Sequence, residues 1–314
     1  MTISDLGEFG LIDAIAAGLP RDGRALVGIG DDAAVLTAPD GRVVASTDLM
    51  LEGRHFRREW SAPADIGAKA AARGLADIAA MGAVPVALLV GFGAPGDLPV
   101  AWARELVAGL ADECARAGAM VAGGDTSGAD AVLLAITALG DLRGRDPVTR
   151  AGARPGDVLA YAGVLGESAA GLALLEAGLA EPASLTAAHR RPAPPYTAGA
   201  EAAGLGATAM IDVSDGLLAD AGHLAAASGV AIDIDTALLP GQTALADAAA
   251  ALGRPGVLDW MLTGGEDHAL VATFPADRGL PGYWTVIGQV RGGFGVYVNG
   301  RTFSGRTGWN HFGG

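Results

Sequence analysis

Five short acidic motifs constrain the fold of this chain more than any other feature. In each motif an aspartate lies next to glycine, alanine or a hydroxyl side chain, and four motifs follow an apolar run typical of a β-strand. The motifs are Gly30-Asp31-Asp32, Ser46-Thr47-Asp48, Ala76-Asp77, Gly123-Gly124-Asp125 and Asp212-Val213-Ser214-Asp215-Gly216. Carboxylates that converge on one cleft repel each other unless cations lie between them. Oxygen ligands of this kind favour Mg²⁺, which usually binds together with phosphates.

Strand and helix patterns between these motifs predict an α/β protein of two domains. Predicted strands in the first part are 25–29, 43–47, 84–92, 120–122 and 132–139, with helices over 66–81 and 100–117. Predicted strands in the second part are 158–162, 209–213, 231–234, 269–274 and 284–290, with helices over 169–177, 217–227 and 244–251. Residues 141–157 are rich in Gly, Pro and Arg, which is typical of a boundary. We therefore expect domains over residues 1–143 and 144–314.

Composition excludes several classes of protein. The formal net charge of −14 argues against a nucleic-acid surface, which needs clustered basic residues. The single cysteine, Cys114, rules out a disulfide within the chain. The first residues include Asp5 and Glu8 and lack the basic segment of a signal peptide. No apolar run approaches the ~20 residues of a membrane span. We expect a cytoplasmic protein with no nucleic-acid or membrane partner.

The scarcity of lysine limits how the chain can bind phosphate. Lys69 is the only lysine, and no Gly-x-x-x-x-Gly-Lys-Ser/Thr sequence occurs, which excludes a P-loop. Metal ions, arginines, backbone amides and helix ends remain for this role. Arg150 and Arg154 are either solvated charges or phosphate contacts. Neither a zinc-binding spacing of His and Cys nor a Gly-x-Ser-x-Gly elbow is present.

Each acidic motif also has a simpler structural interpretation. Asp31 and Asp32 suit a turn, and Asp48 suits either a helix N-cap or a metal ligand. Asp77 follows Arg73 by four residues, so a helical ion pair worth ~0.2–0.5 kcal/mol is the simplest explanation. Asp125 fits a tight turn, although the preceding glycines also suit an anion-binding nest.

Several residues nearer the C-terminus have the same two interpretations. Ser214 or Asp215 suits the N-cap of the following helix, where a phosphate is also stabilised. A C-capping glycine explains Gly264 but leaves Glu266 without a role. A lone histidine such as His55 is more often structural than catalytic, and Trp309 is either core or a stacking surface.

Together and in this order, the motifs resemble those of the thiamine-monophosphate kinase family, which has the aminoimidazole-ribonucleotide-synthetase fold. The matching segments begin at Gly7-Glu8-Phe9 and continue with GIGDDAAV, STDLMLEGRHF, LADIAAMGA, GGDTSG, TRAGARPGD, LGESAAGL, HRRPAPP, IDVSDGL, GGEDH and GWNHF. They cover nearly the whole chain. The Glu-Gly-x-His-Phe and terminal Gly-Trp-x-His-Phe segments favour this family over its relatives.

The resemblance implies ATP- and Mg²⁺-dependent phosphorylation of thiamine phosphate to thiamine diphosphate, with several Mg²⁺ ions. It also implies a homodimer in which the N-terminal sheets of two subunits form one barrel, and a C-terminal domain that closes the cleft. By motif, the implied metal ligands are Asp32, Ser46, Thr47, Asp48, Asp77, Asp125, Asp212 and Asp215. The implied ATP contacts are Gly124, Asp125, Arg150 and Ser214. The implied substrate contacts are His55, Glu266 and Trp309.

The chain departs from the family pattern at a few positions. The usual Asn-Leu-Ser-Asp is Gly74-Leu75-Ala76-Asp77, and Pro195 stands in the Pro-rich loop where arginine is usual. His268 stands where tyrosine is usual, and Asn310 where aspartate is common. None of these changes removes an implied ligand.

Two alternative functions remain open from the sequence. One is another ATP-using enzyme of the superfamily, such as a selenophosphate synthetase or a purine-pathway cyclo-ligase. A selenophosphate synthetase needs a reactive cysteine or selenocysteine near the N-terminus, and none is present. The other is a non-catalytic nucleotide-binding protein, which the complete set of aspartates disfavours.

Overall fold

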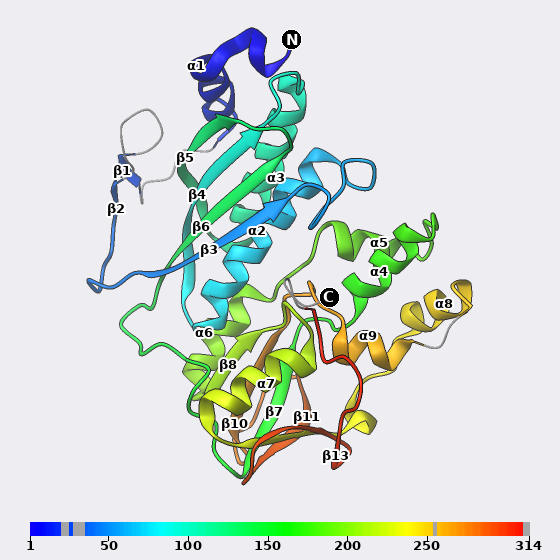
Figure 1. Cartoon of the computed structure of the whole chain (residues 1–314). Helices are drawn as coiled ribbons and strands as arrows, with labels where there is room; N and C mark the ends of the chain where they lie inside the picture. The colour runs from blue at the N-terminus through cyan, green and yellow to red at the C-terminus, as the bar shows by residue number, and fades with distance from the viewer. Residues whose placement is uncertain (20–24, 28–34, 254–255, 310–314) are drawn as a thin grey trace. The chain divides into compact units, whose positions relative to one another are not determined.

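The computed structural model describes residues 1–19, 25–27, 35–253 and 256–309 (Figure 1). The chain divides into two compact units. Unit 1 comprises Met1–Ile78 and Ala83–Gly144, and unit 2 comprises Ala79–Gly82 and Arg145–Gly314. Each unit contains a β-sheet and several α-helices, which confirms the predicted α/β class.

Unit 1 is built on a four-stranded sheet in the order β3-β6-β4-β5. Its strands are β3 (Val44–Leu51), β4 (Val84–Ala94), β5 (Met120–Gly128) and β6 (Leu133–Asp141), and its helices are α1 (Ile3–Ala16), α2 (Pro63–Ala80, whose last residues group with unit 2) and α3 (Val100–Ala117). A small ribbon of β1 (Ala25–Val27) and β2 (Val35–Leu36) completes the described elements of this unit. Only β4 and β5 are parallel; β6 pairs with β3 and β4 in antiparallel fashion.

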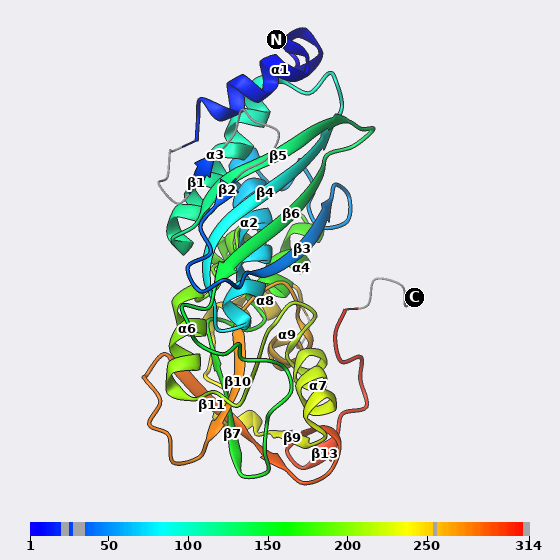
Figure 2. The same cartoon turned by 90° about the vertical axis from the view of Figure 1, so that its left-hand side faces the viewer.

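Helices α2 and α3 cover one face of this sheet (Figure 2). Side chains of a strand alternate between the two faces, and in β6 this alternation is visible as buried residues at every second position. Leu134 and Ile136 are fully buried on the helix-covered face. The opposite face carries Leu49, which is 56% exposed although it is a large apolar side chain. The intersubunit barrel implied by the family stays a prediction, because the structure contains one chain.

Unit 2 is built on a seven-stranded sheet in the order β13-β12-β9-β11-β7-β10-β8. Its strands are β7 (Asp157–Ala162), β8 (Ala209–Asp212), β9 (Ala231–Ile234), β10 (Leu270–Pro275), β11 (Trp284–Arg291), β12 (Gly295–Val298) and β13 (Arg301–Thr302). Its helices are α4 (Glu167–Glu176), α5 (Ala183–Arg190), α6 (Tyr196–Leu205), α7 (Leu217–Ser228), the 3₁₀-helix η1 (Thr236–Leu238), α8 (Thr243–Ala251) and α9 (Val257–Thr263).

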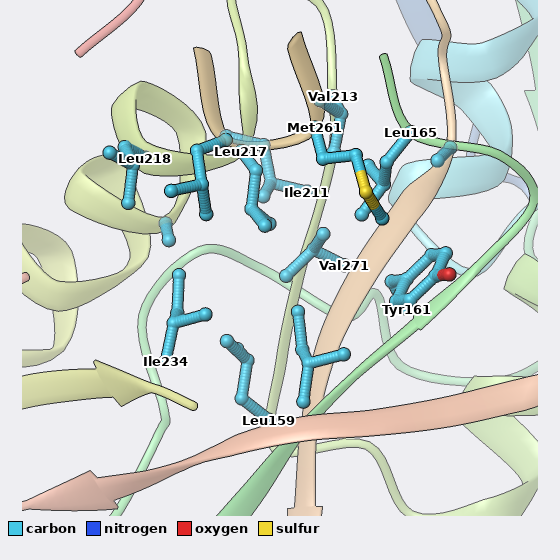
Figure 3. Close-up of a cluster of buried hydrophobic side chains, with 14 of the residues drawn as sticks. Leu159, Tyr161, Leu165, Ile211, Val213, Leu217, Leu218, Ile234, Met261 and Val271 are labelled. Atoms are coloured by element: carbon cyan, nitrogen blue, oxygen red, sulfur yellow. The ribbon is translucent and has the colours of Figure 1, made fainter. Parts of the chain in front are cut away.

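An apolar core joins this sheet to α7 and α9 (Figure 3). Residues of α4 also belong to this core. Its buried members include Leu159 and Val271 from the sheet, Leu217 from α7 and Met261 from α9. Burial of a side chain of this size stabilises a fold by about 1.5–3 kcal/mol. The core fixes the ends of β8 and α7, and therefore the acidic segment between them.

The structure corrects two predicted strand ends. We expected Asp48 and Asp125 just beyond strands that stop at residues 47 and 122. Instead β3 continues to Leu51 and β5 continues to Gly128, so both aspartates lie inside strands. The strand predicted over 209–213 is present as β8 but ends one residue earlier, so Asp212 is its last residue. Helices α1, α5 and α6 were not predicted from the sequence.

Among the described residues, none of the helices combines the length and the apolar character that a membrane crossing requires.

Candidate active site

Strand β3 and helix α2 bring three of the expected ligands together in unit 1. Ser46 and Asp48 are two residues apart on β3 and so share one face. Ser46 Oγ donates a hydrogen bond to Asp77 Oδ2 at 2.5 Å, and Asp77 lies on α2. Arg73, one helical turn earlier, approaches Asp48 Oδ1 at 3.8 Å. We call Ser46, Asp48 and Asp77 the β3–α2 acid cluster.

Gly74 determines how closely α2 lies against these strands. A Cβ atom at this position would lie 3.2 Å from Ile136 Cγ2 and 3.3 Å from Ala138 Cβ, both on β6. The same atom would be 3.9 Å from Asp48 Oδ2. Since this chain has no side chain at position 74, the space beside the Asp48 carboxylate stays open.

Thr47 and Asp125 lie on the other face of the sheet. Thr47 pairs with Thr137, and their hydroxyl oxygens are 3.3 Å apart. Asp125 pairs with Gly91 on β4. Gly91 pairs with Ala135 on β6, which in turn pairs with Leu49 on β3. Residues aligned across a sheet share a face, so Asp125 belongs with Thr47 and Leu49. In unit 1 the structure therefore divides the expected ligand set between two faces.

The other described groups of unit 1, His55 and Gly124, lie in a turn and in strand β5. His55 lies in the turn after β3, and its Nδ1 accepts a hydrogen bond from the Leu51 N–H at 3.0 Å. Because Nδ1 is the acceptor, the proton of the neutral imidazole is on Nε2. Gly124 precedes Asp125 inside β5. Asp31 and Asp32 lie outside the described residues.

In unit 2, three segments meet at the acidic segment 212–216, which we call the α7 loop. The Glu266 N–H donates to Ser214 O at 2.8 Å, and the Trp309 N–H donates to Asp215 O at 3.0 Å. Residues far apart in sequence are thus tied to one loop by backbone hydrogen bonds. Four expected site residues, Ser214, Asp215, Glu266 and Trp309, are brought together in this way.

Two glycines allow these segments to approach so closely. A Cβ atom at position 265 would lie 2.4 Å from Ser214 O, and one at position 308 would lie 2.6 Å from Asp215 O. Both distances are far below a normal contact. Any other residue would push Glu266 or Trp309 away from the α7 loop.

Trp309 presents an exposed aromatic surface beside this loop. Its side chain is 55% exposed. The guanidinium carbon of Arg306 lies 5.4 Å from the centroid of the Trp309 ring, which is a cation–π contact. The residues that follow, including Asn310, are outside the described ranges.

Asp220 organises the start of α7. The N-cap residue is Gly216, which has no side-chain cap, so the predicted N-cap role of Ser214 or Asp215 is wrong. The Asp220 Oδ2 atom accepts from the Asp215 N–H at 3.1 Å and from the Gly216 N–H at 3.0 Å. Burial, and then the nearby charge of Asp212, raise the pKa of Asp220 to about 7. These two amides are therefore already occupied by a protein carboxylate.

Three side chains with metal-ligating atoms lie together at the same helix end. Ligand atoms of Asp215, Asp220 and His223 are all within 4.8 Å of one another. Asp220 is buried, Asp215 is half-buried and His223 is exposed. Of these three residues, only Asp215 was predicted from the sequence; the signal for Asp220 was an aspartate in the first turn of the helix that follows the loop.

Asp267 caps α4 from about 100 positions away. Its carboxylate accepts from the Gly166 N–H at 2.5 Å and from the Ser168 N–H at 2.8 Å, at the N-terminus of α4. Burial raises the pKa of Asp267 to about 7, although these two hydrogen bonds act in the opposite direction. Ser168 Oγ in turn lies 3.1 Å from His189 Nδ1, inside the unit. The two hydrogen bonds of Asp267 join the segment of Glu266 to the start of α4.

His268 contacts an expected ligand directly. Its Nδ1 lies 3.0 Å from Asp212 Oδ2, and both side chains are buried. From the sequence, His268 was only a departure from the family pattern. The contact spans 56 positions in sequence, so no local pattern indicates it.

The structure does not bring Arg150 to the α7 loop. Its carbonyl oxygen accepts from Ser228 Oγ at 3.0 Å, and Ser228 is the last residue of α7. A 12-residue helix is about 18 Å long. Within unit 2, Arg150 and Ser214 therefore lie at opposite ends of α7.

Comparison with known proteins assigns the chain to a family. The family model for the N-terminal domain of AIR synthase related proteins matches residues 30–142, and the model for the C-terminal domain matches residues 154–299. These two matches and the described fold define a two-domain member of the AIR synthase related class.

Curated relatives narrow this class. A thiamine-monophosphate kinase of Mycobacterium tuberculosis (strain H37Rv) is 49% identical over 99% of this chain and 93% of its own length. One of Corynebacterium glutamicum is 41% identical over 92% of this chain and 87% of its own length. The chain belongs to the thiamine-monophosphate kinase family, and it is an enzyme of the kinase class.

Solved structures agree with this assignment. The crystal structure of a thiamine-monophosphate kinase from Stenotrophomonas maltophilia K279a has a TM-score of 0.82 and 35% identity, covering 93% of this chain and 96% of the other. A structure described as AaThiL complexed with AMPPCP and TMP has a TM-score of 0.79 and 35% identity, covering 99% of both chains.

Proposed function

We propose that this chain phosphorylates thiamine phosphate to thiamine diphosphate, with ATP as phosphoryl donor and Mg²⁺ as cofactor. The observation that carries the proposal is the hydrogen bond from Trp309 N–H to Asp215 O. It holds an exposed aromatic surface next to an acidic loop, as a site for an aromatic cation bearing a phosphate requires. The family relationship, and the relative described with AMPPCP and TMP, support the same substrates.

The donor groups fit Mg²⁺. The β3–α2 acid cluster and the α7 loop supply carboxylate and hydroxyl oxygens, which are the ligands of a hard cation. The proposed ligands are Asp32, Ser46, Thr47, Asp48, Asp77, Asp125, Asp212 and Asp215. Bound Mg²⁺ neutralises phosphate charge and orients the transferring group.

The substrate itself supplies the nucleophile. A phosphate monoester has a second pKa of ~6, so thiamine phosphate is largely dianionic at neutral pH. No protein base is then needed to activate the attacking oxygen. The work of the chain is to hold two polyanions in line and to offset their repulsion.

The other proposed residues bind and orient the substrates. Gly124, Asp125, Arg150 and Ser214 are proposed ATP contacts; Arg150 acts with groups other than Ser214, from the far end of α7. Trp309 stacks on the thiazolium or the pyrimidine ring, and Glu266 accepts a hydrogen bond from the aminopyrimidine. His55 contributes the Nε2–H of its neutral ring.

The same proposal includes direct in-line transfer, a cytoplasmic location and a homodimer. Direct transfer follows from the absence of a required protein nucleophile, and it predicts inversion at a chiral γ-phosphorus. Retention of configuration would reject it. The homodimer is supported by the family resemblance and by the exposed Leu49 on the sheet face of unit 1 opposite to α2 and α3.

One assay separates the proposal from its alternatives. The chain is incubated with ATP, Mg²⁺ and thiamine phosphate, and thiamine diphosphate and ADP are quantified. Equal amounts of both products support the kinase. Formation of ADP without thiamine diphosphate supports another ATP-using enzyme of the superfamily, and ATP binding without ADP formation supports a non-catalytic protein.

A further inference from the structure

His268 and Asp212 form a buried pair at the edge of the α7 loop. The two residues are 2% and 5% exposed, and His268 Nδ1 lies 3.0 Å from Asp212 Oδ2. A carboxylate can only accept a hydrogen bond, so Nδ1 carries the proton and donates it. A charge-assisted bond of this kind is stronger than a neutral one.

The backbone fixes the position of the His268 ring. The backbone N–H of His268 donates to Val213 O at 2.9 Å, and Val213 directly follows Asp212. The φ angle of His268 is 54°, in the left-handed region that residues other than glycine rarely adopt. The preceding residue, Asp267, is held by two amides of the α4 start. Such a conformation persists only where its surroundings enforce it, and it is common at functional sites.

The second ring nitrogen shows that stability alone does not explain this histidine. Nε2 is buried, and within the described ranges it has no hydrogen-bond partner. A buried polar atom without a partner destabilises a fold. An apolar side chain would avoid this penalty but would leave Asp212 without its donor. The contact with Asp212 is therefore the feature that requires a histidine here.

The Asp212 carboxylate has one oxygen engaged and one available. His268 takes Oδ2, and among the described residues no hydrogen bond reaches Oδ1. Asp212 is also close enough to Asp220 for its negative charge to raise the pKa of that carboxyl. Neighbouring carboxylates of this kind are stabilised when a cation binds between them.

We propose that His268 is a positioning residue for Asp212: its Nδ1–H holds Oδ2 and thereby presents Oδ1 to a divalent cation. This inference rests on the proposed role of Asp212 as a metal ligand. Residues that orient metal ligands by hydrogen bonds change metal affinity by about 10–100-fold when they are replaced. His268 acts on the cation through Asp212 and makes no contact with the reacting atoms.

Three variants separate positioning from packing. Asparagine in His268→Asn places an N–H near the position of Nδ1 and tolerates a positive φ. Glutamine in His268→Gln places its N–H near the position of Nε2, too far for the same bond. Leucine in His268→Leu fills the space without a donor. His189→Leu is the matched control, because it removes another buried histidine of unit 2, which contacts Ser168 rather than Asp212.

The test is Mn²⁺ binding to the full-length protein, followed by the electron paramagnetic resonance signal of free Mn²⁺, without nucleotide or turnover. We expect Asp212→Asn to weaken Mn²⁺ binding. His268→Leu and His268→Gln should weaken binding of the same Mn²⁺ ion by about 10–100-fold. His268→Asn should stay within about threefold of the unmodified chain, and so should His189→Leu. In the Asp212→Asn background, His268→Leu should have little further effect.

Several outcomes would overturn the proposal. The first is an unchanged Mn²⁺ affinity in His268→Leu, and the second is a loss of Mn²⁺ affinity in His268→Asn as large as in His268→Leu. The third is a decrease of Mn²⁺ affinity by His268→Leu that is as large in the Asp212→Asn background as in the unmodified chain. The fourth is an unchanged Mn²⁺ affinity in Asp212→Asn itself. The proposed kinase function is tested separately, because no step of this titration depends on thiamine phosphate. If the Mn²⁺ pattern holds and no thiamine diphosphate forms, the positioning role stands and the function fails.

Discussion

Asp267 makes the stability of unit 2 depend on pH in a direction that the structure fixes. Its carboxyl is buried and has a pKa of about 7, against 3.8 for an ordinary aspartate. Between these two values the folded state holds about one proton more than the unfolded state. The free energy of unfolding therefore falls as pH rises, by about 1.4 kcal/mol per pH unit for one such group. Above about pH 7 this contribution is lost and the dependence ends.

The perturbation that isolates this effect is Asp267→Asn. Asparagine keeps an acceptor for one of the two amides of Gly166 and Ser168 and does not titrate. Other titrating groups, such as Asp220, are present in both proteins, so they cancel in the difference. We expect the stability of the unmodified chain relative to Asp267→Asn to fall by about 2 kcal/mol between pH 5 and pH 7.

The assay is urea-induced unfolding of the full-length protein at pH 5, 6, 7 and 8, with hydrogen exchange of β7 and β10 peptides reporting on unit 2. Asp259→Asn is the control, because Asp259 is exposed on α9 and its variant should follow the unmodified chain. A difference between unmodified chain and Asp267→Asn that is constant with pH, or that grows as pH rises, would refute the reasoning.

Three further substitutions test the two clusters. Asp48→Asn should lower kcat more than about 100-fold, because it removes a proposed metal ligand. The melting temperature should stay unchanged or rise, because the ion pair of Asp48 with Arg73 is long and partly exposed, and such pairs are worth ~0–1 kcal/mol. Unimpaired turnover would reject Asp48 as a ligand. Gly265→Ala should destabilise unit 2 by about 1–3 kcal/mol in urea unfolding, since the added Cβ would lie 2.4 Å from Ser214 O. Gly241→Ala is the control and should be neutral, because its Cβ would meet no atom within 4 Å. Equal stability of the two variants would contradict the close packing at Gly265. Trp309→Ala should raise KM for thiamine phosphate about tenfold and leave KM for ATP unchanged. Phe294→Ala, at another exposed aromatic residue, is the control. A change in KM for ATP alone would show that Trp309 is not part of the thiamine phosphate site.

Local sequence patterns predicted the elements that depend on local interactions. The bounds of α3 agree with its apolar periodicity, and β8 occupies all but the last residue of the strand predicted over 209–213. The order of the motifs predicted the family, which the comparisons confirm. In these cases propensity and burial act on the same short segment.

The ends of β3 and β5 were wrong because strand pairing extends polar residues beyond the apolar run. Asp48 pairs with Ile136, and Asp125 pairs with Gly91, so both remain in the sheet. The alternation of faces then separates Thr47 from Asp48, which a list of neighbouring oxygens in sequence does not reveal.

The contacts that organise unit 2 could not be predicted from sequence, because they join distant segments. Asp267 binds amides about 100 positions earlier, and His268 binds Asp212. Helix α7 also begins without a side-chain N-cap, and the Asp220 carboxylate instead accepts from the amides of Asp215 and Gly216. Only the folded backbone brings these donors and acceptors together.

The central claim is that the γ-phosphoryl group of ATP passes directly to thiamine phosphate. A rapid-quench experiment with γ-³²P-labelled ATP, Mg²⁺ and excess enzyme tests it in a single turnover. The account predicts that all transferred label appears in the terminal phosphate of thiamine diphosphate, and that no label is bound to protein at any time. Label in free phosphate in place of thiamine diphosphate, or a labelled protein that forms and decays before product appears, would contradict it.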